Sequence, residues 1–332
     1  PRFLVASAAL CAVAVAFAQS APIPNAAPSP AAATVQIPPA PTPTGAASWL
    51  IMDYSNGQVL ASQNPDQRLE PASITKVMTS YVVAAELKAG KIKRTDQVLI
   101  SENAWRGGGG GTDGSTSFLP LNSTVSLDEL ERGMIIQSGN DAAIALAEHV
   151  AGSEQAFTDL MNNYAKKIGM NNSHFVNPHG LSSPEHYSTA RDLALLGRAM
   201  IRDFPETYAY NKIRDYTVNG ILQHNRNGLL WKDASVDGIK TGHTSAAGYC
   251  LLASAKRGEQ RLISAVMGIQ TASAAEGFRL RENGNLALLN WGFRFFETRT
   301  LYAPGKAIAS PKVWKGKLDN VQLGVATPFS IT

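Results

Sequence analysis

The stretch Glu70-Pro-Ala-Ser-Ile-Thr-Lys-Val-Met-Thr-Ser80 places Ser73 three residues before Lys76, at the start of an apolar run that ends at Ala89-Gly90. Apolar residues at helical spacing followed by a glycine predict a helix over residues 74–87. Residues three apart on a helix share one face, so the hydroxyl and the amine can approach within hydrogen-bond distance. A serine at a helix N-terminus also lies beside backbone N–H groups that can stabilise an oxyanion. The stretch therefore indicates a nucleophile and its base at the beginning of a helix.

Two further short motifs follow in the chain. Ser138-Gly-Asn140 falls in a break between two predicted helices, where side chains reach the mouth of a cleft, and Lys240-Thr-Gly242 falls on a predicted strand that can form a wall of it. Each motif is weak alone, because an isolated S-x-x-K commonly marks a helix N-cap with a solvated lysine. Together, and in this order, they match the motif set of penicillin-binding proteins and class A β-lactamases.

The elements around these motifs predict an α+β fold. An Asn56-Gly57 turn joins two strands of a hairpin. Helices are expected over 126–137, 141–150, 154–168, 189–202 and 280–296, and strands over 48–53, 58–60, 215–218, 237–240, 248–255 and 261–269. Strands at both ends of a helical middle, without alternating strands and helices, argue against a doubly wound parallel sheet.

Five consecutive glycines, Gly107 to Gly111, technically satisfy a G-x-G-x-x-G pattern with Gly114. The pattern follows no strand of a strand–helix–strand unit and opens no helix, so we interpret it as a flexible loop and not as a dinucleotide site.

The two ends of the chain differ in composition from the middle. Residues 1–18 are expected to be a signal peptide, because Arg2 precedes an apolar run that ends in Ala16-Phe-Ala18. The alternative, a membrane anchor, needs about 20 apolar residues. Residues 19–47 are an Ala/Pro-rich linker, 48–297 the catalytic domain, and 298–332 the beginning of a truncated β-rich domain. A start at Pro1 and an end within strand-like alternation suggest a fragment.

The amino-acid composition restricts the classes of binding partner that the protein can have. A net charge of +4 without a Lys/Arg cluster among aromatics makes nucleic acid a poor candidate. Cys250 would be the sole cysteine after removal of the leader, and it reads as a buried apolar residue. No metal site or cofactor is expected, because the six histidines show no H-E-x-x-H spacing.

From Ser48 onward the chain resembles the D-alanyl-D-alanine carboxypeptidases of the penicillin-binding protein 5/6 type, which are serine peptidases of family S11. Besides the motifs, the resemblance rests on residues 70–80, 137–142, 179–181, 225–231, 237–244 and 290–297. It implies a β-lactamase/DD-peptidase-like fold: an antiparallel sheet flanked by helices, with a helical subdomain, followed by the start of a small β-rich domain.

The resemblance also implies residue roles. Ser73 is the expected nucleophile and Lys76 its proton acceptor, with Lys240 opposite Lys76. We expect Lys76 to be largely neutral, because burial and the nearby Lys240 charge both favour the neutral amine. The remaining implied residues are Ser138 and Asn140 for proton relay and positioning; Thr241, Gly242 and His243 for alignment of the peptide; the backbone N–H groups of Ser73 and His243 for the oxyanion; and Arg281, with Arg279 as the competing choice, for the substrate carboxylate.

The implied activity is removal of the terminal D-alanine from peptidoglycan stem peptides that end in D-Ala-D-Ala, with β-lactams as covalent inhibitors. The resemblance places the protein in the periplasm, at the inner-membrane surface through a C-terminal helix that this sequence does not contain. A class A-like β-lactamase is disfavoured, because Gly139 stands where those enzymes carry Asp and no E-x-x-L-N pattern follows. A DD-endopeptidase and a non-catalytic peptidoglycan-binding module remain as alternatives.

Overall fold

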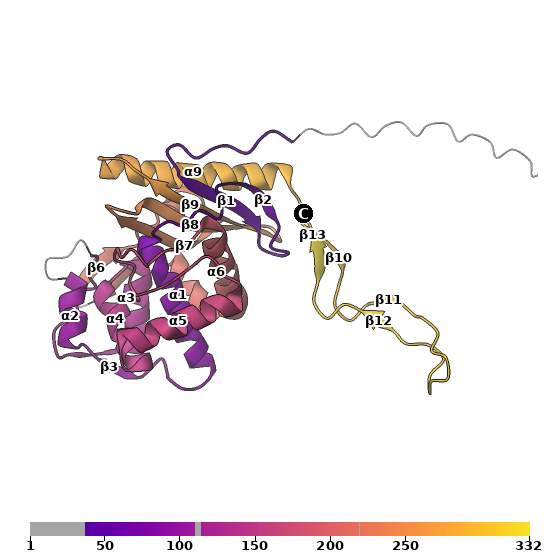
Figure 1. Ribbon diagram of the computed structural model, residues 1–332, viewed down its shortest axis with the longest axis horizontal. Helices are drawn as coiled ribbons and strands as arrows, with labels where there is room; N and C mark the ends of the chain where they lie inside the picture. Colours follow the sequence, from indigo (N-terminus) through magenta and orange to yellow (C-terminus); the bar gives the residue numbers. More distant parts are fainter. Residues whose placement is uncertain (1–36, 110–113, 219) are drawn as a thin grey trace, which may run out of the picture. The chain divides into compact units, whose positions relative to one another are not determined.

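A five-stranded antiparallel sheet forms the centre of the computed structural model, which describes residues 37–109, 114–218 and 220–332 (Figure 1). The strand order is β2-β1-β9-β8-β7, so the first strands of the chain pair with a strand from its last third. Within it, Trp49 lies opposite Val266. The strands are β1 (Ser48–Asp53), β2 (Val59–Gln63), β7 (Val236–Thr244), β8 (Gly248–Arg257) and β9 (Gln260–Ile269).

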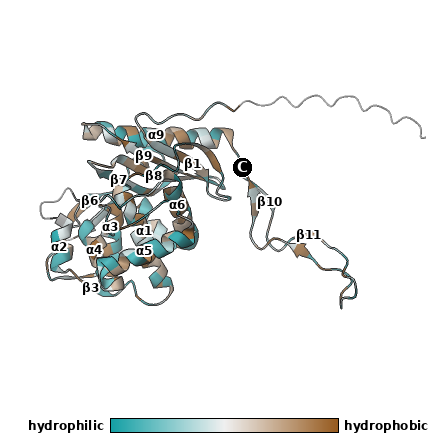
Figure 2. Ribbon diagram, in the orientation of Figure 1, coloured by the Kyte–Doolittle hydropathy of each residue, from teal (hydrophilic) through white to brown (hydrophobic). Residues whose placement is uncertain are grey.

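Helices cover both faces of this sheet. On one face lies α9 (Ala274–Phe295), whose Leu288 belongs to the same buried cluster as Trp49 and Ile51 of β1. The alternate residues Leu50 and Met52 belong to the cluster formed with the other helices. Because both faces are covered, β1 is buried at every position, and apolar strands run between the two helical layers (Figure 2).

The second helical layer surrounds α1, which is buried on nearly all sides. Most of the predicted helices are present close to their expected bounds. Gly90, at φ +71°, follows the end of α1 and confirms the predicted glycine stop. The helices are α1 (Thr75–Lys88), α2 (Glu102–Gly109), α3 (Leu127–Ile136), α4 (Asn140–Ala151), α5 (Glu154–Ile168), α6 (Ala190–Asp203), α7 (Pro205–Tyr208) and α8 (Leu229–Lys232).

Side-chain caps explain where several helices begin. Ser126 Oγ accepts a hydrogen bond from the backbone N–H of Glu129, and Thr189 Oγ1 accepts one from that of Asp192, at the starts of the helices expected over 126–137 and 189–202. The helix expected at 280–296 begins earlier, at Ala274, because Ser273 caps it by accepting from the N–H of Glu276. The sequence interpretation missed this cap.

The interpretation of the glycine run as a loop is wrong for its first residues. Gly107 and Gly108 lie in the last turn of α2. A Cβ at Gly108 would lie 2.2 Å from Cβ of Asp141 in α4, so the two helices pack too closely for any side chain there. The rest of the expected loop, residues 110–113, lies outside the described residues.

Short two-stranded sheets complete the catalytic part. β3 (Gln97–Leu99) pairs with β4 (Thr124–Ser126), and β5 (Asp215–Val218) pairs with β6 (Ile221–His224). Of these strands, the sequence analysis predicted only residues 215–218.

The packed domain begins before the expected boundary at Ser48. Ala40 and Ala46 pack against the cluster that contains Leu288, and the N–H of Ala47 donates to the carbonyl of Met267 at 3.0 Å. These residues belong to a unit that runs from Pro39 to Thr332; of the other unit, Pro1–Pro38, only the last two residues are described. The end of the expected linker is therefore part of the folded domain.

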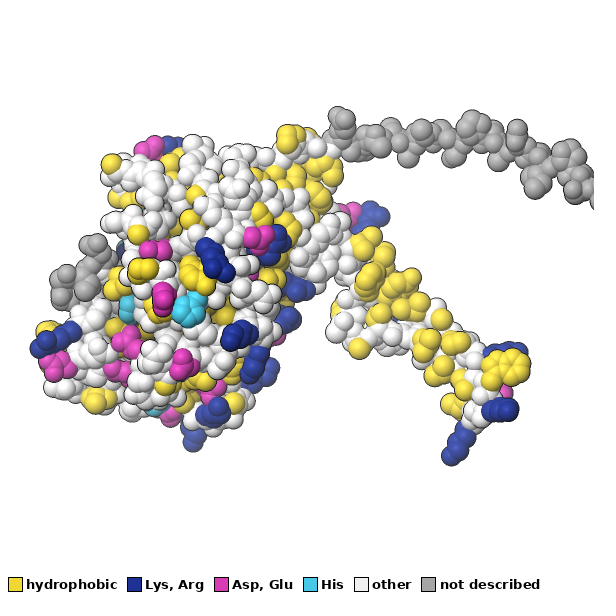
Figure 3. Space-filling model, viewed as in Figure 1, with side chains coloured by type: hydrophobic (Ala, Val, Ile, Leu, Met, Phe, Trp, Pro, Cys, Tyr) yellow, Lys and Arg dark blue, Asp and Glu magenta, His cyan; other side chains and the backbone are white. Residues whose placement is uncertain are grey.

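The C-terminal residues form two small antiparallel pairs. β10 (Arg299–Tyr302) pairs with β13 (Phe329–Ile331), and β11 (Ala307–Ala309) pairs with β12 (Leu323–Gly324). Hydrophobic side chains lie exposed on these strands and their connections, among them Trp314 (Figure 3). Within the described parts of the chain, no helix has the length and apolar character needed to cross a membrane.

Candidate active site

Ser73 and Lys76 meet at the entrance to α1. Ser73 lies in a 3-10 turn, η1 (Ala72–Ile74), that leads directly into the helix. Lys76 Nζ lies within hydrogen-bond distance of Ser73 Oγ, at 3.0 Å, so the structure brings together the pair that the spacing predicted. Ala72, just before the serine, has φ +47°, an unusual conformation for a residue with a side chain. Such strain clusters at active sites, where the surrounding structure maintains it.

The Lys76 amine is completely buried and lies among three oxygen atoms. Besides Ser73 Oγ, it approaches Asn140 Oδ1 at 2.7 Å and the carbonyl oxygen of His179 at 2.7 Å. The amide and carbonyl oxygens can only accept hydrogen bonds. A neutral amine has two N–H groups for these two acceptors, and its lone pair then remains for the hydroxyl proton of Ser73. The arrangement therefore suits Lys76 as a proton acceptor.

The charge state of Lys76 follows from its surroundings. Burial, together with the nearby charge of Arg226, lowers the pKa of Lys76 to about 7 against the opposing charge of Asp141. The sequence analysis named burial and the Lys240 charge as the causes; burial is confirmed, whereas the cation that lowers the pKa of Lys76 is Arg226. Burial and the charges of Lys76, Arg226 and Arg281 also lower the pKa of Lys240.

Ser138 and Lys240 form the second half of the site. Lys240 Nζ on β7 donates to Ser138 Oγ at 2.9 Å and to the carbonyl of Thr241 at 3.3 Å. Ser138 lies between α3 and α4, as predicted, and has φ +71°. Gly242 allows β7 to approach the serine turn, since a Cβ there would lie 2.7 Å from the carbonyl oxygen of Pro71. The three motifs thus converge on one place.

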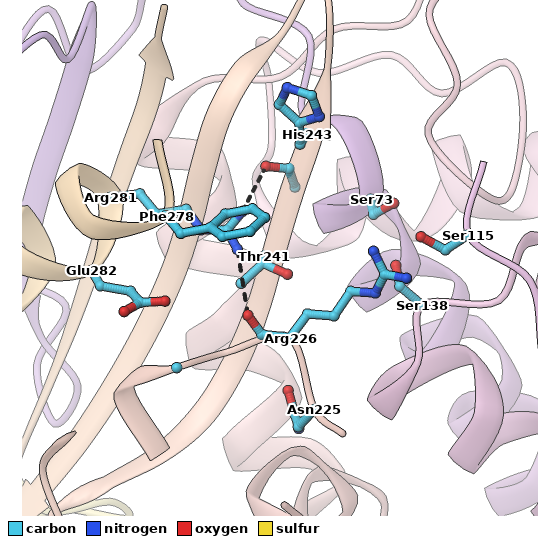
Figure 4. Close-up of a pocket in the computed structure, with 12 residues that line it drawn as sticks. Ser73, Ser115, Ser138, Asn225, Arg226, Thr241, His243, Phe278, Arg281 and Glu282 are labelled. Atoms are coloured by element: carbon cyan, nitrogen blue, oxygen red, sulfur yellow. Dashed lines mark hydrogen bonds between the residues drawn. The ribbon is translucent and has the colours of Figure 1, made fainter. Parts of the chain in front are cut away.

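A pocket of about 360 Å³ opens over this place (Figure 4). Asn140, Lys76 and Lys240 are buried beside it and do not line it. Arg226 extends across the cleft toward Ser138 (Figure 4). The lining residues are Ser73, Ser115, Ser138, Asn225, Arg226, Gly228, Thr241, Gly242, His243, Phe278, Arg281 and Glu282.

Of the two candidate arginines, only Arg281 lines the pocket. It is 3% exposed and donates to the carbonyls of Gly242 at 3.3 Å and Arg226 at 3.4 Å, while its Nε is buried without a hydrogen-bond partner among the described residues. Burial lowers the pKa of Arg281 to about 10, so it is cationic at neutral pH. Arg279 instead points to solvent and pairs with Glu276 at 3.7 Å.

Aromatic side chains support the Arg281 side of the pocket. The Phe278 ring lies 4.8 Å from the Arg281 guanidinium, and the His243 ring stacks on Tyr249 with centroids 4.1 Å apart. Of the aromatic residues of α9, Trp291 packs into the core cluster that contains Trp49 and Leu288.

His179 and His186 are buried neutral histidines near Lys76. Burial lowers the pKa of His179 to about 3 and that of His186 to about 4. His179 Nδ1 accepts from the N–H of Leu181 at 3.1 Å, a hydrogen bond within its own loop. Within the described residues, no group of His, Cys, Asp and Glu side chains could hold a metal ion, and Cys250 is fully buried.

The sequence analysis missed several residues of the site. Arg226, Ser115 and Phe278 line the pocket, and the His179 carbonyl contacts Lys76. Arg226 lies in one of the stretches that carried the family resemblance, so it was available as a signal. The other contacts arise between segments far apart in the chain, and no local pattern marks them.

An antiparallel sheet flanked by helices, with a buried lysine beside a serine and a second serine–lysine pair opposite, defines a serine acyl-transfer enzyme of the DD-peptidase class. Residues 34–271 match the family model of D-alanyl-D-alanine carboxypeptidase, peptidase S11, and residues 296–332 match that of the penicillin-binding protein 5 C-terminal domain. The chain belongs to the D-alanyl-D-alanine carboxypeptidase family.

Individual relatives agree with this assignment. D-alanyl-D-alanine carboxypeptidase DacC of Escherichia coli is 50% identical over 86% of this chain and 71% of its own length. The structure of penicillin-binding protein 5 from Haemophilus influenzae is similar with a TM-score of 0.81 and 47% identity, over 86% of this chain and 82% of that one. A Streptomyces K15 DD-transpeptidase mutant is similar with a TM-score of 0.68 and 26% identity, over 75% and 98%. The protein is a serine D-Ala-D-Ala carboxypeptidase that acts on peptidoglycan stem peptides and binds β-lactams.

Proposed function

We propose that Ser73 is the nucleophile of this carboxypeptidase and that neutral Lys76 accepts its proton. The observation that carries the proposal is the arrangement around Lys76 Nζ, which lies 3.0 Å from Ser73 Oγ and 2.7 Å from each of two oxygens that can only accept. These acceptors occupy the N–H groups of the amine and leave its lone pair for the hydroxyl. General base catalysis needs this proximity together with a pKa near the working pH.

In the acylation step, Ser73 Oγ attacks the carbonyl carbon of the penultimate D-alanine while its proton passes to Lys76 Nζ. We assign the oxyanion to the backbone N–H groups of Ser73 and His243, since Gly242 allows β7 to lie directly against the serine turn. The C–N bond then breaks. The leaving amine takes a proton from the relay of Lys76, Ser138 and Lys240, and D-alanine departs.

Substrate orientation comes from the other side of the pocket. Arg281 is the proposed partner of the terminal carboxylate, because it is a buried cation with a free Nε beside the pocket. The peptide lies along Thr241, Gly242 and His243 of β7. Asn140 is buried beside the pocket and positions Lys76, whose Nζ lies 2.7 Å from Asn140 Oδ1. Water then hydrolyses the acyl-enzyme.

A β-lactam carries an amide and a carboxylate in a similar relation and enters the same path. Its ring opens when Ser73 acylates, and the leaving nitrogen remains attached to the acyl group. The leaving group therefore cannot diffuse away and make room for water, which favours a persistent adduct.

The organisation of the chain remains part of the proposal. Residues 1–18 form the signal peptide, 19–38 the linker and 39–297 the catalytic domain, which starts before the boundary expected from the sequence. Residues 298–332 belong to a C-terminal β domain. Secretion by this leader places the enzyme in the periplasm, where its stem-peptide substrate occurs. Contact with the inner-membrane surface, through a helix beyond residue 332, is proposed from family resemblance alone.

Intact-mass analysis with benzylpenicillin, beside D-alanine release from a pentapeptide, tests the site assignment. The wild-type protein should gain one penicillin, and Ser73→Ala should lose both the adduct and at least about 10³-fold in D-alanine release. Ser62→Ala, on the exposed edge strand β2, is the matched control and should behave as wild type.

Other results point to other functions. Rapid penicillin hydrolysis without an adduct would indicate a β-lactamase, and cleavage of cross-linked dimers in preference to pentapeptide would indicate an endopeptidase. A folded wild-type protein that reacts with neither compound would be a peptidoglycan-binding module. An adduct retained by Ser73→Ala would refute the assignment of the nucleophile.

A further inference from the structure

Asp141 follows the catalytic-site residue Asn140 directly, and its carboxylate is a buried hydrogen-bond acceptor. It is 2% exposed. It accepts from the N–H groups of Ser117 at 2.8 Å, Leu119 at 3.3 Å and Ala142 at 2.9 Å, and from Thr116 Oγ1 at 2.8 Å. No lysine or arginine of the described residues forms an ion pair with it, so its charge is balanced by N–H and O–H groups.

Three of these donors belong to one segment, Gly114–Leu119, which forms part of the cleft. Ser115 of this segment lines the pocket, and its carbonyl accepts from the N–H of Asn140 at 2.7 Å. Figure 4 shows Ser115 across a narrow gap from Ser73. The segment therefore makes two kinds of contact next to the second motif: one with the backbone of Asn140 and one with the carboxylate of Asp141.

Glycines make this contact possible. A Cβ at Gly139, in the middle of the second motif, would lie 2.0 Å from Ser117 Oγ, and a Cβ at Gly133 of α3 would lie 2.7 Å from it. A Cβ at Gly108 of α2 would lie 2.2 Å from that of Asp141. The close approach of Ser117 and Asp141 therefore leaves no room for a side chain at position 139.

We propose that Asp141 is a positioning residue of the active site, whose carboxylate holds Gly114–Leu119 as a wall of the cleft. The inference rests on the proposed role of Lys76. Asp141 acts through Asn140 and Ser115 and does not itself line the pocket.

The charge of Asp141 has a measurable direction. It raises the pKa of Lys76 against the effects of burial and of Arg226. The charged or titratable groups that interact with Lys76 are Asp141, Arg226, Lys240, His179 and His186. Of these, only Asp141 is acidic. Removing its charge should lower the pKa of Lys76 and leave more of the amine neutral at a given pH.

The test uses Asp141→Asn and Thr116→Val, with kcat and KM measured across pH 5–9 and normalised to sites titrated with a fluorescent penicillin. In the wild-type protein, the donors around Asp141 use both of its carboxylate oxygens. The amide of Asp141→Asn has only one acceptor oxygen, so we expect kcat/KM to fall about 10- to 100-fold at its pH optimum. The acid limb of its pH profile, where activity falls because Lys76 becomes protonated, should also move to lower pH. Thr116→Val removes one donor and keeps the charge; KM should rise about fivefold with the acid limb unmoved.

Asp66→Asn is the matched control, since it removes the same charge from an exposed pair with Arg191 and should change neither quantity. Unchanged kcat/KM per titrated site in Asp141→Asn, with only a lower melting temperature, would overturn the proposal. If Asp141→Asn does not fold, Thr116→Val decides alone. An unchanged KM in that variant would show that the Asp141 carboxylate does not hold Gly114–Leu119 in place. Failure of the proposed base is distinguishable, because the wild-type protein would then show no acid limb near pH 7.

Discussion

Arg226 extends across the mouth of the cleft, and its charge lowers the pKa of Lys76, which is buried beneath the cleft in α1. The guanidinium is held by a hydrogen bond of 3.0 Å from its Nε to the carbonyl of Gln137, the residue before the second motif. A cation fixed there disfavours a second cation at Lys76. Burial and a residue outside the three motifs thus bring the pKa of the base close to neutral pH.

The pH dependence of acylation should follow Lys76. Because its pKa is about 7 and the neutral form is active, the acylation rate should rise with pH and level off above about pH 7. At pH 5 about 1% of the amine is neutral, so the rate should be roughly 100-fold below its maximum. Stopped-flow acylation with a fluorescent penicillin measures this directly. An acid limb near pH 10, or a flat profile down to pH 5, would contradict Lys76 as the base.

Arg226→Gln should move this acid limb to higher pH. Loss of the cation raises the pKa of Lys76, and each unit of increase lowers the neutral fraction about tenfold below the limb. The direction is opposite to that expected for Asp141→Asn, so the two variants bracket the wild-type profile. Arg106→Gln, an exposed arginine paired with Glu102, is the control and should leave the profile unchanged. A shift to lower pH in Arg226→Gln would show that its charge does not act as described.

Arg281→Gln should weaken both peptide and β-lactam recognition. Hydrogen bonds to a charged partner contribute about 1.5–3 kcal/mol, so kcat/KM for D-alanine release should fall about 10- to 100-fold. Arg279→Gln is the matched control on the same helix, because its side chain points to solvent. It should lose less than about twofold. Equal losses in the two variants, measured with the same pentapeptide, would leave the carboxylate without its assigned partner.

Glycine at position 108 should matter more for stability than glycine at 107. A Cβ at Gly108 meets the backbone of Asp141 at 2.5 Å, which cannot move away, whereas a Cβ at Gly107 meets only the terminal Cδ1 of Ile144 at 2.5 Å. Overpacking costs about 1–3 kcal/mol, while alanine gains about 1 kcal/mol over glycine within a helix.

Gly108→Ala should therefore lower the free energy of unfolding, and Gly107→Ala should leave it nearly unchanged. Thermal and urea unfolding of both variants measure the difference. Equal stability of the two would mean that α2 can shift away from α4 without cost.

The sequence alone predicted the motifs, their order and most of the secondary structure. Ser73 and Lys76 are neighbours because three residues span one helical turn, and Ser126 and Thr189 cap helices through contacts three residues away. These relationships are local, so composition and spacing encode them. The resemblance to a known family added the fold and the roles of the remaining residues.

Only the tertiary structure decided how Lys76 becomes a base. The amine contacts Asn140, 64 positions away, and the His179 carbonyl, 103 positions away, while Arg226 reaches in from a third segment. The same holds for the α2 glycines, whose meaning depends on Asp141 of α4. Burial and charge proximity depend on which distant segments meet. A one-dimensional pattern records the residues that take part, whereas the pKa and the shape of the cleft arise from the distances between them.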